Sequence, residues 1–587
     1  MRTQRKYGWL SIVLSSVLVV SAVWGQAAGE NPVVAAARDG DLQAVRALIA
    51  KRANVNEPAR DGSTALVWAA YHSNLEMTRA LLAAGAAVDT ANNYGITPLL
   101  QASRAGDAAV MQALLKAGAS SKLAHPQGET PLMAAARTGS IGAVRMLLES
   151  DADVNASDAY QQQTPLMWAA AEGHAEVVQA LLTAKADPNR KARVTALEDR
   201  KHADHPTGGF TALMFAARNG HEAAAKALIA GGADPKLTNG DGATVLSVAI
   251  VNDRFDLAAA LLDVGADAND GSLYFAVEMH DATTDMRAKD GSRLRADHQN
   301  KLNSLGLVKL LLDRGADPNK RFVGQLHSTT LCCGEEINAS PFFRAAMASD
   351  VEALKLMLAK GAQVEWSPAE VKKDGGTGGG GAAGRGMNAN VGKTPTMVAM
   401  AGGRGAAFAA GPGFDRLGPP PFREAANREP LDALKVLLAA GADANAKAPD
   451  GATLLHQAVT ARQVPIIREL VAAGAKLDAT NKENLTPLLV AEKPEPPKVA
   501  GNNNDPNTYK RKQDAREDVI AVLRELMKLG PNDPAPQPPP VAEEKKDTEK
   551  KADEKKDTEK KDGEKTPAEA TVAATTPASP SQPGAAR

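Results

Sequence analysis

TPLMAAARTG, residues 130–139, is the stretch of sequence that decides the fold, because variants of it recur at a nearly constant interval. Steps of 33, 33, 34, 47 and 33 residues separate Thr64, Thr97, Thr130, Thr164, Thr211 and Thr244, and Thr453 and Thr486 are again 33 apart. In five of these units a glycine follows 21 residues after the threonine, as Gly85, Gly118, Gly232, Gly265 and Gly474. Two independent landmarks in one register indicate an internal repeat.

Each repeat is predicted to form two short helices. In Thr130-Pro131 the threonine can cap free backbone amides, and proline suits the first helical position. Nine residues after the threonine, Gly139 supplies the left-handed conformation that ends a helix of about two turns. A second helix then carries a leucine pair, such as Leu114-Leu115, to the next glycine. The unit is therefore a helix, a turn and a helix.

A polar loop joins one unit to the next. Segments such as Ala316-Asp317-Pro318-Asn319 lead to Asp-Gly or Tyr-Gly dipeptides, which favour tight turns and a projecting β-hairpin. One such unit cannot bury its own apolar face, so neighbouring units must stack. We therefore predict an all-α repeat fold in the form of a solenoid.

These residues resemble the ankyrin repeat, whose Thr-Pro-Leu-His-x-Ala core matches Thr130-Pro131-Leu132-Met133-Ala134-Ala135. The resemblance implies an ankyrin-type solenoid of the exported, bacterial type. Twelve units, covering roughly residues 31–530, begin at Asn31, Thr64, Thr97, Thr130, Thr164, Thr211, Thr244, Ser272, Ser340, Thr394, Thr453 and Thr486.

The sequence departs from the family pattern in two respects. The core histidine occurs only as His456, whereas other units have residues such as Val67, Leu100, Met133, Met167 or Met214. Second helices end on Arg52, Asp151 and Lys185 where glycine is expected, so we predict positive φ at these non-glycine residues.

Composition and charge fit an array better than a single domain. The chain has 587 residues, of which 44% are hydrophobic and 4% aromatic, with 68 Lys plus Arg against 69 Asp plus Glu. One hydrophobic core does not grow to that length. A net charge of −1 provides no global attraction for nucleic acid or an acidic membrane, so we expect neither as a partner.

The N-terminal residues 1–28 have the pattern of a signal peptide. Arg2, Arg5 and Lys6 precede an apolar run from Leu10 to Val23, and small residues follow between Gly25 and Gly29. We predict cleavage there and an exported protein, periplasmic or secreted, with no stable membrane span after cleavage. The alternative is a retained anchor, although the run is shorter than the roughly 20 residues of a spanning helix.

The remaining chain is predicted in three parts. Residues 29–270 form regular repeats, and residues 271–530 form repeats separated by large inserts that end in a helix at 514–530. Inserts are expected near 193–206, 280–302, 320–335, 372–391 and 402–428, as binding loops or as mobile filler. Residues 531–587, rich in Pro, Lys and Glu, are predicted to be disordered, as a solvated extension or a tether.

Three groups of residues are candidate sites of chemistry. Gly386 to Thr394 misses the phosphate-loop spacing by one residue. The adjacent Cys332 and Cys333, near His327, allow a disulfide, free thiols or a metal site. The pair His202 and His205 suits a polar loop better than a metal. We predict no enzyme, no metal and no cofactor; the alternative is a metal- or redox-dependent envelope enzyme that uses the Cys332/Cys333 insert.

In the family, hairpin tips and the exposed ends of first helices form a concave binding surface. The resemblance therefore implies a monomeric, noncatalytic scaffold that binds a partner protein; a secreted effector that binds a foreign-cell protein would share these features. Trp68 and Trp168 are predicted as core. The candidate contact residues are Arg60, Asp61, Tyr71, His72, Asn93, Tyr94, Arg104, Gln127, Arg137, Tyr160, Gln161, Glu172, Arg218 and Asn219.

Overall fold

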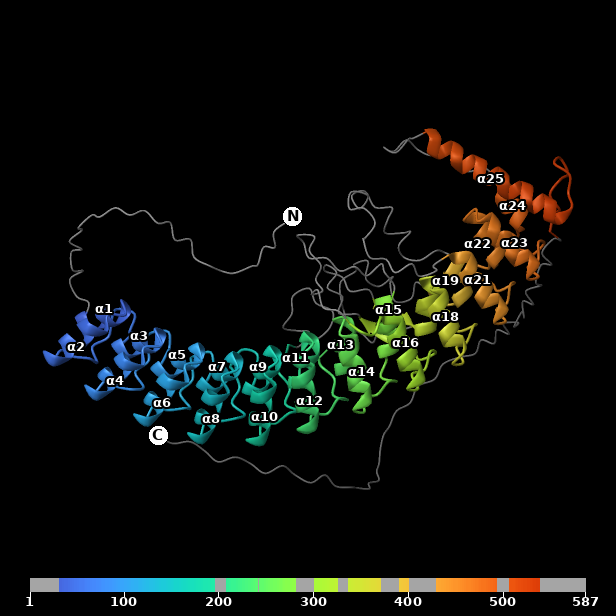
Figure 1. Ribbon diagram of the computed structural model, residues 1–587. Helices are drawn as coiled ribbons and strands as arrows, with labels where there is room; N and C mark the ends of the chain where they lie inside the picture. The colour runs from blue at the N-terminus through green and yellow to red at the C-terminus, as the bar shows by residue number, and fades with distance from the viewer. Residues whose placement is uncertain are drawn as a thin grey trace, which may run out of the picture. The chain divides into compact units, whose positions relative to one another are not determined.

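The structure, a computed structural model, describes residues 31–195, 207–240, 242–280, 300–325, 336–370, 390–400, 429–493 and 506–538. Within these residues the chain forms twelve consecutive helix pairs, as the repeat predicts (Figure 1). The predicted signal segment and residues 539–587 lie outside the described residues.

The first helices of the pairs are α1 (Pro32–Arg38), α3 (Ala65–Tyr71), α5 (Pro98–Ala105), α7 (Pro131–Thr138), α9 (Pro165–Glu172), α11 (Ala212–Asn219), α13 (Val245–Val251), α15 (Ser272–His280), α17 (Pro341–Met347), α19 (Pro395–Met400), α22 (Leu454–Thr460) and α24 (Pro487–Glu492). The second helices are α2 (Leu42–Ala50), α4 (Leu75–Ala83), α6 (Ala108–Lys116), α8 (Ile141–Glu149), α10 (Ala175–Thr183), α12 (Glu222–Ala230), α14 (Phe255–Asp263), α16 (Ser304–Asp313), α18 (Val351–Leu358), α21 (Pro430–Ala439), α23 (Val464–Ala472) and α25 (Pro506–Met527).

The predicted caps set the helix boundaries. The hydroxyl of Thr130 accepts the amide of Met133 at 3.2 Å, with Pro131 in the first position of α7. The helix ends at Gly139, whose φ of 74° is left-handed. Arg52, Asp151 and Lys185 have φ values of 58°, 60° and 70°, so the prediction of positive φ at non-glycine residues is confirmed.

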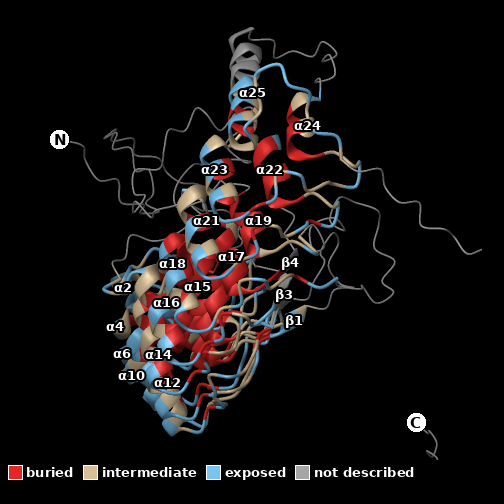
Figure 2. Cartoon of the chain, turned by 90° about the vertical axis from the view of Figure 1, so that its right-hand side faces the viewer, coloured by how far each residue is buried: buried red, intermediate tan, exposed pale blue. Residues whose placement is uncertain are grey.

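The elements form layers within the array, as Figure 2 shows by burial. First helices are mostly buried; in α7 every residue from Pro131 to Ala136 is buried. Second helices bury one side only, as Ala143, Val144 and Leu147 do in α8. Each first helix packs on the first helix of the next unit, and second helices on second helices. The apolar core is therefore shared between neighbours.

The loops close as tight turns that are stabilised by backbone and side-chain hydrogen bonds. In a typical loop the amide of Asn92 donates to the carbonyl of Ile96 at 3.1 Å. Among the described residues, paired strands occur as β1 (Val194–Thr195) with β2 (Thr207–Gly208), and β3 (Phe322–Gln325) with β4 (Glu336–Ala339). Both pairs are antiparallel and flank predicted inserts, not the Asp-Gly or Tyr-Gly dipeptides where hairpins were expected. At two of the Asp-Gly loops the expected hairpin is reduced to a single antiparallel bridge, Thr238 with Thr244 and Lys447 with Thr453.

The last pair differs from the prediction. Its second helix, α25, begins at Pro506 rather than at residue 514 and ends at Met527. Residues such as Lys510, Arg511 and Lys512 are good helix formers, which favours the longer helix. Arg524 then donates to the carbonyls of Gly530 and Asp533, so residues 531–538, assigned to the tail, fold back against α25.

Asparagine side chains link five of the outer loops to the next unit. Asn189 donates to the carbonyl of Gly232 at 3.1 Å and accepts the amide of Asp234 at 2.8 Å. The same two bonds recur at Asn56, Asn155, Asn319 and Asn445. One side chain thus satisfies a donor and an acceptor on the neighbouring backbone, which keeps the units in register.

His456 makes the bonds that its position predicts. Its Nδ1 accepts the amide of Thr453 at 3.2 Å, and its Nε2 donates to the carbonyl of Leu485 in the next unit at 2.9 Å. Burial is the main cause of a lowered pKa for His456. The neutral ring therefore links the last two units.

We expect Asn189→Ala to lower the free energy of unfolding by about 1–2 kcal/mol, because two net hydrogen bonds are lost. Asn189→Asp keeps the acceptor and should cost less, as Asp89 already accepts the amide of Ser120 in this way. Urea unfolding followed by circular dichroism measures both variants. Equal stability of Asn189→Ala and the wild type would contradict the proposed link.

We expect the contribution of His456 to the free energy of unfolding to decrease as the pH is lowered. The unfolded histidine takes up a proton near its ordinary pKa of 6.5, whereas the folded ring resists protonation. Its contribution is therefore complete above pH 6.5 and is lost as the pH falls toward the lowered folded pKa. Between about pH 7.5 and about pH 5.5, His456→Met should lose less stability than the wild type, as measured by thermal unfolding. Methionine is chosen because Met133 occupies the equivalent position of its own unit. Identical losses in both proteins would show that His456 is not responsible.

Candidate functional site

The predicted contact residues fall on two parallel rows of the array. One row consists of the loop tips, and the other consists of the C-terminal ends of α3, α5, α7, α9 and α11. Because successive units repeat the same backbone path, equivalent positions lie beside one another. We call residues 60–61, 71–72, 93–94, 104, 127–129, 137, 160–161, 172, 193 and 218–219 the strip.

Backbone hydrogen bonds tie the loop tips together. The amide of Asn93 donates to the carbonyl of Asp61 at 2.9 Å, and Ala159 donates to Gln127 at 2.8 Å. The series continues from Arg193 to Gln161 at 2.7 Å and from Gly240 to Gly208 at 2.8 Å. Pro126, which has no amide hydrogen, cannot donate such a bond. The tips are therefore held in fixed positions relative to their neighbours.

Three tyrosines dominate the exposed apolar area of the strip. Side chains of Tyr160, Tyr94 and Tyr71 are 73%, 66% and 57% exposed, the largest values among the large hydrophobic residues that the structure describes. Tyr94 and Tyr160 stand on loop tips, and Tyr71 ends α3. Arg60, Gln127 and Gln161 are also exposed. Polar groups on a rigid, partly apolar surface suit recognition of another protein.

The two tryptophan side chains are more exposed than predicted. Trp68 and Trp168, predicted as core, are only half-buried, although both pack against the apolar cluster. Trp68 lies 5.6 Å from Tyr71 and 6.4 Å from His72, measured between ring centroids. One face of each indole therefore supports strip residues while the other packs inward.

Two arginines of the strip surround one glutamate. Arg104 forms an ion pair with the mostly buried Glu129, and Arg137 lies 4.0 Å from the same carboxylate. The guanidinium of Arg137 also stacks on Trp168, with 5.2 Å to the ring centroid. Arg104 is thus occupied inside the array, whereas Arg137 is exposed.

Arg218 stands at a similar aromatic site. Its guanidinium is 5.2 Å from the ring centroid of Phe215 and 5.5 Å from that of Phe210. Partial desolvation by these rings lowers the pKa of Arg218, and the side chain stays charged at neutral pH. Sequence reasoning missed Phe210 and Arg193; the repeat register, which places Arg193 at a tip, could have identified the latter.

Two predicted contact residues instead hold the array together. His72 donates from Nε2 to the carbonyl of Arg38 at 2.7 Å, and Asn219 donates to the carbonyl of Ala171 at 2.6 Å. His174 makes an equivalent bond to the carbonyl of Arg137 at 2.9 Å. Each bond satisfies an orphan carbonyl at the end of the preceding first helix. His72 and Asn219 therefore hold neighbouring units together, and their role as partner contacts stays a prediction.

Comparison with known proteins identifies the family of the repeats. A family model described as ankyrin repeats (3 copies) matches residues 33–125, 99–192, 195–272 and 422–498, together more than half of the chain. The chain belongs to the ankyrin repeat family. Helices α16, α17, α18 and α19 lie outside those matches, so the structure extends the ankyrin array across them.

Other comparisons add little. The crystal structure of the human ASB11 ankyrin repeat domain is 28% identical, with a TM-score of 0.32, and the match covers 37% of this chain and 91% of that chain. No curated protein matches this chain. No helix of the described residues is long and apolar enough to cross a membrane.

Metal and redox chemistry has no described site. Cys332, Cys333, His327, His202 and His205 lie outside the described residues. Among the residues that are described, no group of three or more His, Cys, Asp or Glu side chains could hold a metal ion. Gly386 of the phosphate-loop near miss is also outside, and Thr394 precedes α19 as the repeat predicts.

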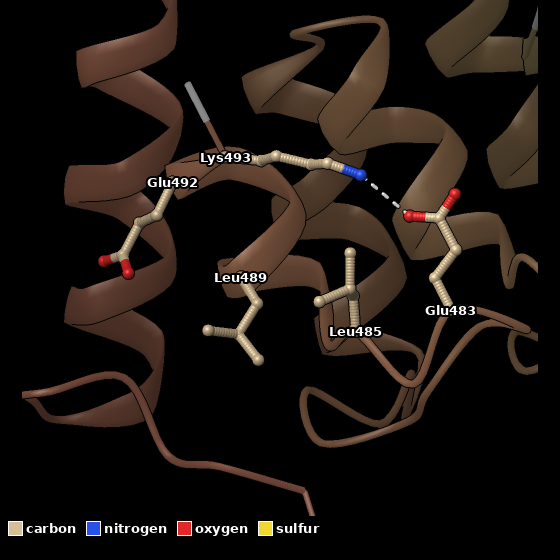
Figure 3. Close-up of a pocket in the computed structure, with 5 residues that line it drawn as sticks. All are labelled: Glu483, Leu485, Leu489, Glu492 and Lys493. Carbon is tan, nitrogen blue, oxygen red and sulfur yellow. Dashed lines mark hydrogen bonds and ion pairs between the residues drawn. The ribbon is translucent and has the colours of Figure 1, made fainter. Parts of the chain in front are cut away.

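A pocket of about 490 Å³ lies at the far end of the array (Figure 3). Leu485 and Leu489 form part of its lining, and Lys493 points toward Glu483 at 2.9 Å. Glu492 points away and pairs with Arg524 at 2.7 Å. The charged residues that line the pocket are therefore paired within the array. The pocket is separate from the strip.

A buried polar cluster lies between α15 and α18, and sequence reasoning missed it. Arg344 pairs with Glu278, and His280 lies 3.4 Å from Asp350; all four side chains are buried. Ser304 is 2.9 Å from Nδ1 of His280. Asp350 also caps α18 through the amide of Ala353. The chain of contacts from Ser304 through His280 to Asp350 resembles a proton relay. The burial of His280 and Asp350 and the capping role of Asp350 indicate a structural role instead.

Proposed function

We propose that this ankyrin repeat protein is a noncatalytic scaffold that binds a partner protein through the strip. Ankyrin repeats are protein-interaction modules, which supports the general function. The observation that carries the proposal is the position of Tyr71, Tyr94 and Tyr160, the most exposed large apolar side chains described, on one strip.

Physical chemistry favours this surface over other parts of the array. Tyrosine buries a large area with little loss of side-chain entropy and offers a hydroxyl for hydrogen bonding. The bonded loop tips hold Tyr94 and Tyr160 before any partner arrives, which reduces the ordering cost of binding. Arg137 and Arg218 add guanidinium groups of the kind that interfaces use most often.

We propose further that the protein acts outside the cytoplasm, in the periplasm or after secretion, as a monomer. The basic residues, the apolar run and the small residues before Gly29 support export through a cleaved signal. A retained anchor would keep the same array at a membrane surface, and a secreted effector would carry it to a foreign cell.

We expect Tyr94→Ala/Tyr160→Ala to reduce recovery of the partner by about tenfold or more, because central aromatic contacts carry most of an interface's energy. Cross-linked affinity capture from the native extract, quantified by mass spectrometry, measures this. Leu123→Ala/Val264→Ala is the matched control, since these side chains are 40% and 43% exposed outside the strip. Unchanged recovery of every partner by the tyrosine variant would exclude the strip.

We expect the protein made in its native cells to lack about the first 28 residues. Intact-mass measurement and N-terminal sequencing detect the new terminus between Gly25 and Gly29. Full-length protein in the membrane fraction would support the retained anchor instead, and full-length protein in the cytoplasm would contradict export.

A further inference from the structure

The strip is basic although the whole chain is nearly neutral. Its exposed arginines are Arg60, Arg137, Arg193 and Arg218. With Arg104, the strip has five arginines against three acids, Asp61, Glu129 and Glu172. Asp61 and Glu129 are partly buried, the first bonded by Ser63 and the second paired with Arg104. Glu172 is the exposed acid of the strip. A net charge of −1 for the chain therefore conceals a local excess of positive charge.

Two of these arginines are pre-positioned by aromatic rings. Arg137 lies over Trp168 of the next unit, and Arg218 lies over both Phe210 and Phe215. Stacking uses the flat face of a guanidinium and leaves its N–H edge available to donate. The guanidinium of Arg137 also lies 4.0 Å from Glu129, which is beyond hydrogen-bond distance, and Arg104 already pairs with that carboxylate, so Arg137 can donate to a further anion. Partial desolvation at Arg218 also strengthens any bond that its edge makes to an anion. These edges form two fixed donors for carboxylates.

We propose that the strip binds an acidic, extended segment of the partner protein. Arg137 and Arg218 would receive two carboxylates of that segment, and Tyr94 and Tyr160 would cover apolar side chains between its acids. The charge complementarity of the strip carries this assignment. It rests on the proposed protein-binding function and specifies the chemistry of the partner.

Glu172 favours an acidic protein over a nucleic acid. It ends α9, between α7, which carries Arg137, and α11, which carries Arg218. A nucleic acid presents phosphates at every nucleotide and would bring one close to this carboxylate. A peptide can place its acids at the two arginines and an uncharged residue at Glu172. Spaced carboxylates therefore fit the strip better than a continuous phosphate backbone.

The test uses the full chain and defined probes. One fluorescent peptide of about sixteen residues alternates Glu with Leu and Ala, long enough to cross several units when extended. A second peptide replaces each Glu with Gln, and a single-stranded oligothymidylate of equal length reports nucleic-acid binding. Fluorescence anisotropy in physiological salt gives the affinities.

We expect the Glu peptide to bind at least about tenfold more tightly than the Gln peptide. Arg137→Gln/Arg218→Gln should remove that difference, and Arg137→Lys/Arg218→Lys should retain part of it, since lysine keeps the charge but loses the planar fork. The control Arg46→Gln/Arg145→Gln changes exposed arginines of α2 and α8 and should leave it unchanged. Circular dichroism confirms that each variant is folded.

Equal affinity for both peptides, or no binding of either, would overturn the acidic assignment. Tighter binding of the oligothymidylate that also depends on Arg137 and Arg218 would overturn it in favour of a nucleic acid. Capture of the partner protein distinguishes failure of the acidic-segment proposal from failure of the proposal that the strip binds a protein. Loss of capture in the tyrosine variant but not in the arginine variants would leave protein binding intact and reject the acidic segment.

Discussion

The structure depends on burial of apolar surface between neighbouring units. A pair of helices as short as α7 and α8 has too little interior to fold alone, so the side of α7 that carries Leu132 is covered by its neighbours. Burial has no direction, and it would tolerate sliding of one unit over the next. Hydrogen bonds supply the direction, because Asn189 satisfies both a donor and an acceptor of the following unit.

The same requirement explains where the proposed binding surface lies. Stacking uses the inner helix faces and the helix-end carbonyls, and the latter take His72, His174 and Asn219 as partners. Positions that stacking does not use are free to vary, and these are the loop tips and the last residues of first helices. Tyr160 is exposed because the loop bonds that hold its backbone do not involve its side chain.

The fold could be predicted because the caps and turns that define each helix are local in the sequence. The contacts between units could not be predicted in this way. Thr130 and Gly139 act within their own helix, so their spacing identified both ends. The roles of His72 and Asn219 depend on carbonyls 34 and 48 residues away, which no local pattern reveals. Arg344 finds Glu278 across 66 residues and two predicted inserts. The sequence therefore did not reveal the bonds that His72 and Asn219 make between units, and the strip as a binding region stays a prediction.

The interrupted part of the array shows how register survives without a constant step. Closing a longer loop costs little extra free energy, so inserts between helices do not by themselves prevent stacking. They do remove the regular spacing that aligns one unit with the next. Buried pairs such as Arg344 with Glu278 add less stability than apolar contacts would, but they are satisfied in one alignment only. The polar cluster between α15 and α18 thus adds contacts that depend on the alignment of these helices, in the part of the array where the step between units is not constant.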